Sequence, residues 1–492
     1  MLKTPPESLL PAFQLGPNLC PDYRSDLGDS KRMLERWVAD SHFRDLCRQD
    51  PRGAAAQFHL RANPEELRPL WNPNGQRICL TALSQDPNQA LSLRRYCAFL
   101  LEKFQFLERM RQEGAPAHPA FRAWRQRQIE RCNSELASRK GQFLVHAPFV
   151  LELGLGCSVG CWFCAVSAPK LGEQFTYNAS NAVLWRDCLA AIQEVVGETA
   201  GRWGYCYWGT DPLDNPDYES FLLDFHRVLG AWPQTTTAQA HKHIERARQL
   251  LELGKRHGGY LDRFSVVALS HWQRLHDAFT PSELTFVECI AQNKESTEPK
   301  AVAGRAFAAN RKLAARGQQE LVDERLTSTI ACVSGFMLNM VTRQVSVITP
   351  CNASQSHPDG FYTLGSRSFA CGPSLRRALL DLIDECMPLS LGHEHNLSFR
   401  HDLDYSPESQ GFRLTDRGQN RSFGHPAWAQ LGQLLSQGQH TAPQIAEVLS
   451  ERLGLSWEES FYRLNQLFDA GLLNERTPSD PNQVEKGPIT YE

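Results

Sequence analysis

The stretch Leu151–Cys164, LELGLGCSVGCWFC, decides how the rest of the chain is interpreted. The apolar run over residues 149–153 predicts a short buried strand, and the glycine-rich residues behind it predict a loop. Cys157, Cys161 and Cys164 lie on this loop at C-x3-C-x2-C spacing. Three thiolates at this spacing can hold three irons of a [4Fe–4S] cluster, whereas a fully ligated cluster takes four cysteines. The remaining iron would then be open to chelation by a small molecule.

A structural zinc site and a set of incidental thiols are the alternatives for the three cysteines. Zinc sites usually draw on paired C-x2-C or Cys/His knuckles, and no second knuckle lies nearby in the sequence. Gly154, Gly156 and Gly160 allow the backbone to wrap closely around an inorganic core. Because a strand precedes the loop, the local context also fits a cluster motif. The sequence therefore favours an iron–sulfur cluster.

Composition sets the broad class of the protein. The chain has 492 residues, 41% hydrophobic and 22% charged, with a formal net charge of −3. These values are typical of a soluble globular protein with about two to four domains, and they give no electrostatic reason to expect nucleic-acid binding. No apolar run reaches a membrane span, and the N-terminus has no signal-peptide core. Fifteen cysteines without small-domain disulfide spacing indicate a reducing, cytoplasmic location.

Hydrophobic periodicity divides the chain into four predicted regions. Residues 1–145 are expected to form a helical accessory domain, and residues 146–320 alternate between strand and helix. Residues 321–415, in which Ser328–Pro350 alternate like an antiparallel pair, are expected to be a β-rich extension covering the active site. Residues 416–492 are expected to form a small winged-helix-like domain and a tail.

The alternating region predicts an α/β fold with a parallel sheet and right-handed crossovers. Its strands are expected at residues 149–153, 203–208, 234–238, 264–269 and 284–290. In such folds the functional site lies at the carboxyl ends of the strands.

The aromatic Phe163, just before the third cysteine, completes a C-x3-C-x-Φ-C motif. This motif resembles the radical S-adenosylmethionine (SAM) superfamily. The resemblance implies a partial (β/α)6 barrel that binds a [4Fe–4S] cluster and SAM. It also implies that Phe163 packs against the adenine, and the alternative for this residue is a place in the barrel core.

A second stretch, Gly209-Thr210-Asp211-Pro212, follows the expected strand at residues 203–208. It resembles the Gly-Gly-Glu-Pro stretch of the superfamily, with Thr210 in place of glycine and Asp211 in place of glutamate. In the family this strand end binds the methionine amino group, and Asp211 still supplies an acceptor. Taken alone, the four residues are also compatible with a type I turn.

Two later strand ends carry further candidates for SAM binding. Thr237 could reach the carboxylate or ribose of SAM, and Ser270 could bond a ribose hydroxyl. An ordinary helix N-cap is the alternative for each.

The motif CSVGCWFC, together with the later TPCNAS at residues 349–354, resembles the peptide epimerases of proteusin (polytheonamide-type) pathways. The resemblance implies an isomerase that converts L- to D-residues in a ribosomally made precursor peptide with a leader. It also implies an electron donor such as flavodoxin or ferredoxin. Epimerisation needs a hydrogen returned to the opposite face of Cα, and a thiol suits this because its S–H bond is weak.

Three cysteines outside the cluster motif are candidates for this hydrogen donor. Cys332 lies inside an alternating strand, where a free cysteine is usually core. Cys371 is expected on a loop after the strands. Cys351 ends a strand behind Pro350, within the stretch that resembles the epimerases. We therefore choose Cys351 as the donor and keep Cys371 as the alternative.

The region Phe423–Asn474 predicts three short helices closed by Gly471-Leu472-Leu473. It resembles small peptide-recognition domains of modified-peptide pathways, which bind a leader peptide by strand addition beside a helix. No pair of wing strands is evident in the sequence, and the helices lack a dense basic face for DNA. A packing domain is the alternative.

Two further functions are compatible with the cluster motif. Peptide crosslinking often uses auxiliary cysteine-rich motifs, and C-methylation often uses a cobalamin domain. No CxxC pair follows Cys164, and no cobalamin domain can be assigned. An iron–sulfur DNA-binding regulator would not need the Gly209–Pro212 stretch. Epimerisation is therefore the preferred hypothesis.

Overall fold

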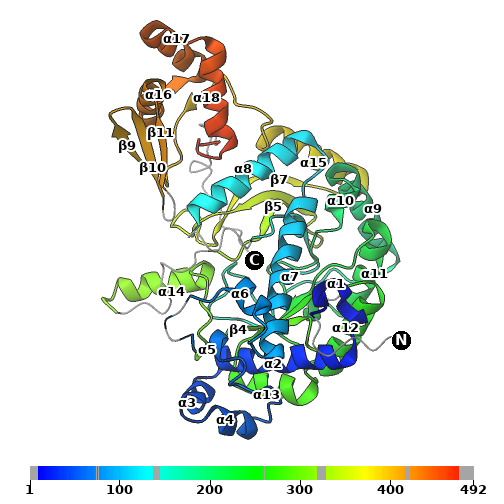
Figure 1. Cartoon of the computed structure of the whole chain (residues 1–492). Helices are drawn as coiled ribbons and strands as arrows, with labels where there is room; N and C mark the ends of the chain where they lie inside the picture. Colours follow the sequence, from blue (N-terminus) through cyan, green and yellow to red (C-terminus); the bar gives the residue numbers. More distant parts are fainter. Residues whose placement is uncertain are drawn as a thin grey trace.

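The computed structural model describes residues 9–475 apart from residues 74, 76, 137–143, 260, 319–328 and 417–419. It is a mixed α/β structure, which confirms the fold class expected from the sequence. The first residues of the predicted β-rich extension and the tail after residue 475 lie outside the described residues. In Figure 1 the C-terminal unit stands at one end of the molecule, and helices α2–α4 stand at the other.

Helices make up the N-terminal part of the described chain. They are α1 (Ala12–Leu15), α2 (Pro21–Ala39), α3 (Ser41–Gln49), α4 (Pro51–Gln57), α5 (Arg68–Trp71), α6 (Leu80–Gln85), α7 (Leu91–Glu113) and α8 (Pro119–Glu135). Asp40 caps α3 by accepting hydrogen bonds from the backbone N–H groups of His42 and Phe43, which satisfies donors that a helix start leaves free.

Helix α8 differs from the other N-terminal helices because most of its surface is buried. Phe121 and Trp124 belong to the same hydrophobic cluster as Phe149 and Phe336 of the central sheet. The ring centroids of Phe121 and Phe336 lie 5.1 Å apart. Beyond its first residue, only a narrow outer side remains exposed, at Arg122 and Gln126, so α8 is part of the central body, although it was expected among the accessory helices.

The central sheet has the strand order β1-β5-β6-β7. The elements from its first strand to its last helix are β1 (Ala147–Glu152), α9 (Ala179–Val196), α10 (Glu198–Gly201), α11 (Tyr218–Leu229), β2 (Thr236–Thr237), α12 (Ile244–Arg256), β3 (Asp262–Val266), α13 (Leu269–Ala278), β4 (Val287–Ala291), α14 (Gly304–Ala314), β5 (Val333–Asn339), β6 (Gln344–Pro350), β7 (Phe361–Ser368) and α15 (Gly372–Cys386). Strand β5 pairs parallel with β1, and β5, β6 and β7 pair antiparallel. The chain therefore returns to extend the sheet that β1 begins.

The strand expected at residues 203–208 does not form. Tyr205 makes one isolated parallel bridge to Val150, and its carbonyl accepts from the N–H of Leu151 at 2.8 Å. Beyond it the N–H of Gly209 donates to the carboxylate of Glu152 instead of to a backbone carbonyl. The Glu152 side chain thus replaces the backbone acceptor that a neighbouring strand would supply, and the pairing with β1 ends after the single bridge at Tyr205.

A second, parallel sheet has the order β2-β3-β4. Among the described residues the two sheets are separate and no closed barrel forms. Helix α2 covers the edge strand β4, where Glu35 accepts the N–H of Cys289 at 3.1 Å. No helix within the described residues combines the length and the hydropathy needed to cross a membrane.

The C-terminal unit contains a sheet that was not predicted from the sequence. Its elements are β8 (Asn396–Leu397), β9 (Asp404–Glu408), β10 (Gly411–Thr415), β11 (Asn420–Gly424), α16 (Pro426–Gln437), β12 (His440–Thr441), α17 (Ala442–Leu453) and α18 (Trp457–Asp469). Strands β9, β10 and β11 form an antiparallel sheet with β10 in the middle. Phe412 and Leu414 are buried in the unit's own core, whereas most residues of β9 and β11 are exposed or half-buried. Because few residues of these strands are apolar and buried, the hydrophobic pattern of the sequence does not indicate them.

The placement of α8 in the core generates a stability prediction. Trp124 is 1% exposed, so Trp124→Ala should lower the free energy of unfolding by about 3–5 kcal/mol through lost burial and the cavity left behind. Chemical denaturation would measure this. Trp457→Ala is the matched control, because Trp457 is 50% exposed and its loss should change stability by about 0.5 kcal/mol or less. Equal effects of the two substitutions would contradict the core position of α8.

Candidate functional site

The loop that carries the three cysteines begins as a short backbone ribbon after β1. The N–H groups of Leu155 and Cys157 donate to the carbonyls of Glu173 and Pro169, at 2.9 Å each. Gly156 has a φ of +75°, and a Cβ at this position would lie 2.2 Å from the carbonyl oxygen of Lys170. Only glycine fits this turn, because the backbone of Lys170 lies against it.

The three thiols line one cavity of about 550 Å³. Backbone N–H groups point to two of them, from Val159 to the sulfur of Cys157 at 3.5 Å and from Ala168 to the sulfur of Cys164 at 3.4 Å. Burial, together with the neighbouring Cys164 and Cys157, raises the pKa of Cys161 to about 11. The thiols of Cys157 and Cys164 are therefore close enough to that of Cys161 to influence its pKa.

The residues around the thiols fit an iron–sulfur cluster in several respects. Sulfur ligands from one loop, N–H donors to sulfur and a polar turn in the same cavity are what such a cluster uses. Within the described residues, no three His, Cys, Asp or Glu side chains are gathered around the position of a single metal ion. The fit to a cluster therefore rests on the donor set and on the shared cavity.

Arg305 clamps the cysteine loop from the start of α14. Its guanidinium donates to the carbonyl of Cys161 at 2.8 Å and to the carbonyl of Ala168, and its backbone N–H donates to the carbonyl of Cys164 at 2.9 Å. Gly304, with a φ of +55°, leaves no room for a Cβ beside that carbonyl. Arg305 was not predicted from the sequence, because an arginine in an alanine-rich helix carries no signal of its own.

Gly209, Thr210 and Asp211 line the same cavity as the thiols, and the backbone of Asp211 hydrogen-bonds to the thiol of Cys157. The N–H of Gly209 donates to Glu152 at 2.6 Å. Glu152 is at the carboxyl end of β1, and burial raises the pKa of its carboxyl group. The cysteine motif at Cys157–Cys164 and the Gly-Thr-Asp-Pro stretch at Gly209–Pro212 thus lie at one site, as expected from the sequence.

Asp211 is buried and both of its carboxylate oxygens are engaged. They accept from the hydroxyl of Thr237 at 2.7 Å, from the N–H of Ala238 at 2.7 Å and from the N–H of Leu213 at 3.0 Å. Burial raises the pKa of Asp211, while these three bonds lower it. The aspartate therefore fastens the turn to the end of β2, and Thr237 lies beside it as a buried partner.

Of the two other predicted SAM-binding residues, Phe163 lies at the cavity and Ser270 does not. Phe163 lines the cavity and also packs against Val302 and Ala306. Ser270 is exposed in the first turn of α13 and is not among the cavity-lining residues. Strand β3 ends at Val266, earlier than expected, and Ser265 lines the cavity instead.

The three candidate hydrogen donors are in different environments. Cys351 is fully buried and is not among the cavity-lining residues, although its neighbour Asn352 is. Cys371 is exposed at the N-cap of α15, beside α9, and is not among the lining residues. Cys332 lines the cavity, and burial raises its pKa to about 11.

The loop between β6 and β7 joins the cysteine loop to the rest of the site. The N–H of Cys351 donates to the carbonyl of Gly360 at 2.9 Å, which closes the base of this loop. At the other end Asp359 accepts from the hydroxyl of Ser167 at 2.7 Å, and the carbonyl of Pro358 accepts from the N–H of Gly304 at 2.7 Å. The TPCNAS stretch therefore reaches the same site through Asn352, which lines the cavity.

With this geometry established, comparison with known proteins places the chain in a family. No family model matches the sequence. The uncharacterised protein y4wI of Sinorhizobium fredii is 35% identical over 460 residues, which cover 92% of this chain and 88% of that protein. The chain therefore belongs to the same family as y4wI.

A similarity to a solved structure was also found. The crystal structure of BtrN in complex with AdoMet and 2-DOIA aligns with 48% of this chain and 81% of that one, at 12% identity and a TM-score of 0.31. A likeness at this TM-score is too weak to support an argument about fold or function.

The shared cavity of the three thiols generates the first site prediction. Replacing Cys157, Cys161 and Cys164 together with alanine should abolish iron–sulfur absorbance in anaerobically reconstituted protein and all cleavage of SAM to 5′-deoxyadenosine. Cys79→Ala is the control, because Cys79 is an exposed thiol outside the cavity and should retain both signals. A triple variant that still cleaves SAM would exclude a cluster at this loop.

The bonds of Asp211 generate the second site prediction. Asp211→Ala leaves two backbone N–H groups and the Thr237 hydroxyl without their acceptor, so the turn should loosen. We expect SAM binding to weaken by about 10- to 100-fold, measured by equilibrium dialysis, with the cluster absorbance retained. Thr237→Ser, which keeps the hydroxyl, is the control and should bind SAM normally. An unchanged SAM affinity in Asp211→Ala would move the binding site elsewhere.

Proposed function

We propose that this protein is a radical SAM enzyme that epimerises L- to D-residues in a ribosomally synthesised precursor peptide. The observation that carries the proposal is one cavity of about 550 Å³ lined by Cys157, Cys161 and Cys164 and by Gly209–Asp211. Both sequence motifs of the superfamily therefore meet in one place, although the third cysteine and Gly209 lie 45 positions apart in the chain. A structural zinc site would not account for the second motif.

The proposed cofactors set what the protein side chains must do. When bound, the cluster and SAM supply a 5′-deoxyadenosyl radical that takes Hα from a residue of the peptide. Cys157, Cys161 and Cys164 would hold the cluster, and Arg305 would keep their loop in place. The turn at Gly209–Asp211 would seat the methionine end of SAM, with its backbone oriented by Glu152 and by the end of β2. Phe163 would pack against the adenine.

Cys351 is the proposed hydrogen donor from the opposite face. Its thiol gives a hydrogen atom to the Cα radical, which inverts the residue and leaves a thiyl radical. One electron from the external donor and one proton from solvent restore the thiol. The position of Asn352 in the cavity wall supports this assignment. Cys351 is fully buried just behind the wall residue Asn352, so the peptide would reach its thiol beside Asn352 and not in open solvent.

The C-terminal unit is the proposed binding site for the leader of the peptide. Strand β11 is an edge of its sheet, so its outer side can pair with an added strand. Phe423 of β11 lies 5.0 Å from Trp428 between ring centroids, and Arg463 of α18 lies over Trp428 at 5.2 Å. An extended segment beside β11 would therefore meet an aromatic surface and a cation from α18. The electron donor is proposed to be a flavodoxin or a ferredoxin.

Co-expression with the neighbouring precursor peptide in deuterated water tests the function. Each epimerised residue should carry one deuterium at Cα, because the donor thiol exchanges with solvent, and mass spectrometry should show a gain of one mass unit per site. Chiral amino-acid analysis should find D-residues at the same sites. A peptide without its leader is the comparison substrate. A loss of two mass units would indicate crosslinking, and an unchanged peptide would contradict the proposal.

The donor is identified by comparing three single variants in the same experiment. Cys351→Ala should still cleave SAM but should form neither D-residues nor deuterated sites. Cys371→Ala and Cys332→Ala should behave like the unchanged protein. Loss of D-residues only in Cys371→Ala, or only in Cys332→Ala, would transfer the donor role to that residue. Normal epimerisation in all three variants would exclude a thiol donor at these positions.

A further inference from the structure

The backbone on both sides of Cys351 is held by the last turn of α8. Arg131 donates to the carbonyl of Pro350 at 2.5 Å. Glu135 accepts the N–H of Asn352 at 2.7 Å, and its own carbonyl accepts from the side-chain amide of Asn352 at 2.7 Å. The peptide groups that precede and follow Cys351 are thus both bonded to one helix.

Arg131 and Glu135 form a buried ion pair, with side chains 9% and 4% exposed. Two charges buried in this way cost desolvation energy, which their attraction recovers only when the remaining polar atoms are also bonded. Arg131 meets this condition through Thr349 at 3.1 Å and Gln128 at 2.8 Å. The ion pair is therefore built into the bonds that hold the end of β6.

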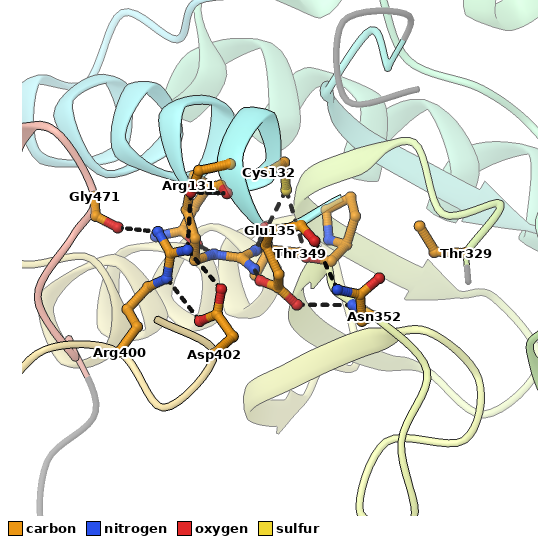
Figure 2. A network of polar contacts seen from close by, with 12 residues as sticks. Arg131, Cys132, Glu135, Thr329, Thr349, Asn352, Arg400, Asp402 and Gly471 are labelled. Carbon is orange, nitrogen blue, oxygen red and sulfur yellow. Dashed lines mark hydrogen bonds and ion pairs between the residues drawn. The ribbon is translucent and has the colours of Figure 1, made fainter. Parts of the chain in front are cut away.

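The C-terminal unit contacts the same turn of α8 from the other side. Arg400 donates to the hydroxyl of Ser134 at 2.8 Å and pairs with Asp402 at 2.7 Å, and it also donates to the carbonyl of Gly471. Figure 2 shows this network running from Gly471 and Arg400, past Arg131, to Glu135 and Asn352. The turn lies between the proposed leader-binding unit and the cavity wall.

We propose that Arg131 and Glu135 are positioning residues, which fix the Pro350–Asn352 backbone so that the Cys351 thiol meets the peptide radical at one place beside Asn352. This inference rests on the proposed function and adds to it the element that aims the thiol. A hydrogen atom moves only between atoms in near contact, so a misplacement of about 1 Å can slow such a step by about 100-fold. The radical-forming side of the site, at Cys157–Cys164 and Gly209–Asp211, makes no use of this ion pair.

The test compares a graded series at Glu135. Glu135→Gln keeps the volume and an acceptor for Asn352 but loses the charge that pairs with Arg131, and Glu135→Ala loses both. The number of 5′-deoxyadenosine molecules formed per D-residue should rise several-fold in Glu135→Gln and about 10- to 100-fold in Glu135→Ala, with cluster absorbance retained. Glu130→Ala is the matched control on α8, because Glu130 accepts from Gln126 of the same helix.

A second readout does not depend on the activity. In the resting protein Cys351 is fully buried and Cys371 is exposed, so brief treatment with iodoacetamide followed by mass spectrometry should label Cys371 and spare Cys351. Both Glu135 variants should label Cys351 faster, and Glu130→Ala should not. If Glu135→Ala fails to fold, the labelling of Glu135→Gln decides the matter.

The positioning role would be overturned by two unchanged results in both Glu135 variants. These are the slow labelling of Cys351 by iodoacetamide and the number of 5′-deoxyadenosine molecules formed per D-residue. If the unchanged protein forms no D-residues, the proposed function fails. The labelling result then still decides whether Glu135 holds the end of β6.

Discussion

Buried and half-buried carboxylates that accept backbone N–H groups hold this protein together where strand pairing is missing. The pairs are Glu152 with Gly209, Asp211 with Ala238, Asp262 with Thr235, Glu35 with Cys289, and Glu135 with Asn352. An N–H buried without an acceptor costs about 1–3 kcal/mol. A closed barrel supplies acceptors from the neighbouring strand, and the two separate sheets of this protein do not. The carboxylates are costly to bury as well, since burial raises the pKa of Asp262 to about 7, and the N–H bonds partly offset that cost.

The same device gives the candidate site its shape. Glu152 sets the direction in which the chain leaves the sheet after Tyr205, and Asp211 joins the resulting turn to the end of β2. The turn therefore lies beside the three thiols in one cavity. Elsewhere in the wall, Glu135 holds Asn352, just after the end of β6. The proposed enzyme would then keep radical formation and hydrogen return on two separately supported walls, which is what inversion from opposite faces requires.

Much of the local structure could be predicted from the sequence, because it depends on short-range rules. The strand before Cys157 follows from an apolar run, and the glycine at position 156 follows from a turn that admits no Cβ. The mixed α/β class follows from the alternation of strand and helix. The prediction of a strand at residues 203–208 was wrong, because the aromatic alternation there is that of a strand but the N–H of Gly209 goes to a side chain. Strands β9–β11 were missed, because their surface is polar and only Phe412 and Leu414 mark the buried face.

The sequence by itself determined the chemistry available at this site: three thiols at cluster spacing, a turn with an acidic residue and a cysteine behind a proline. These features depend on residues close together in the chain, so their spacing carries the information. Only the tertiary structure decided that α8 belongs to the core, that Arg305 clamps the cysteine loop and that Glu135 bonds to Asn352. The last contact joins residues 217 positions apart. A buried bond between distant residues leaves no periodicity in the sequence, because it is created by the packing of α8 against the end of β6.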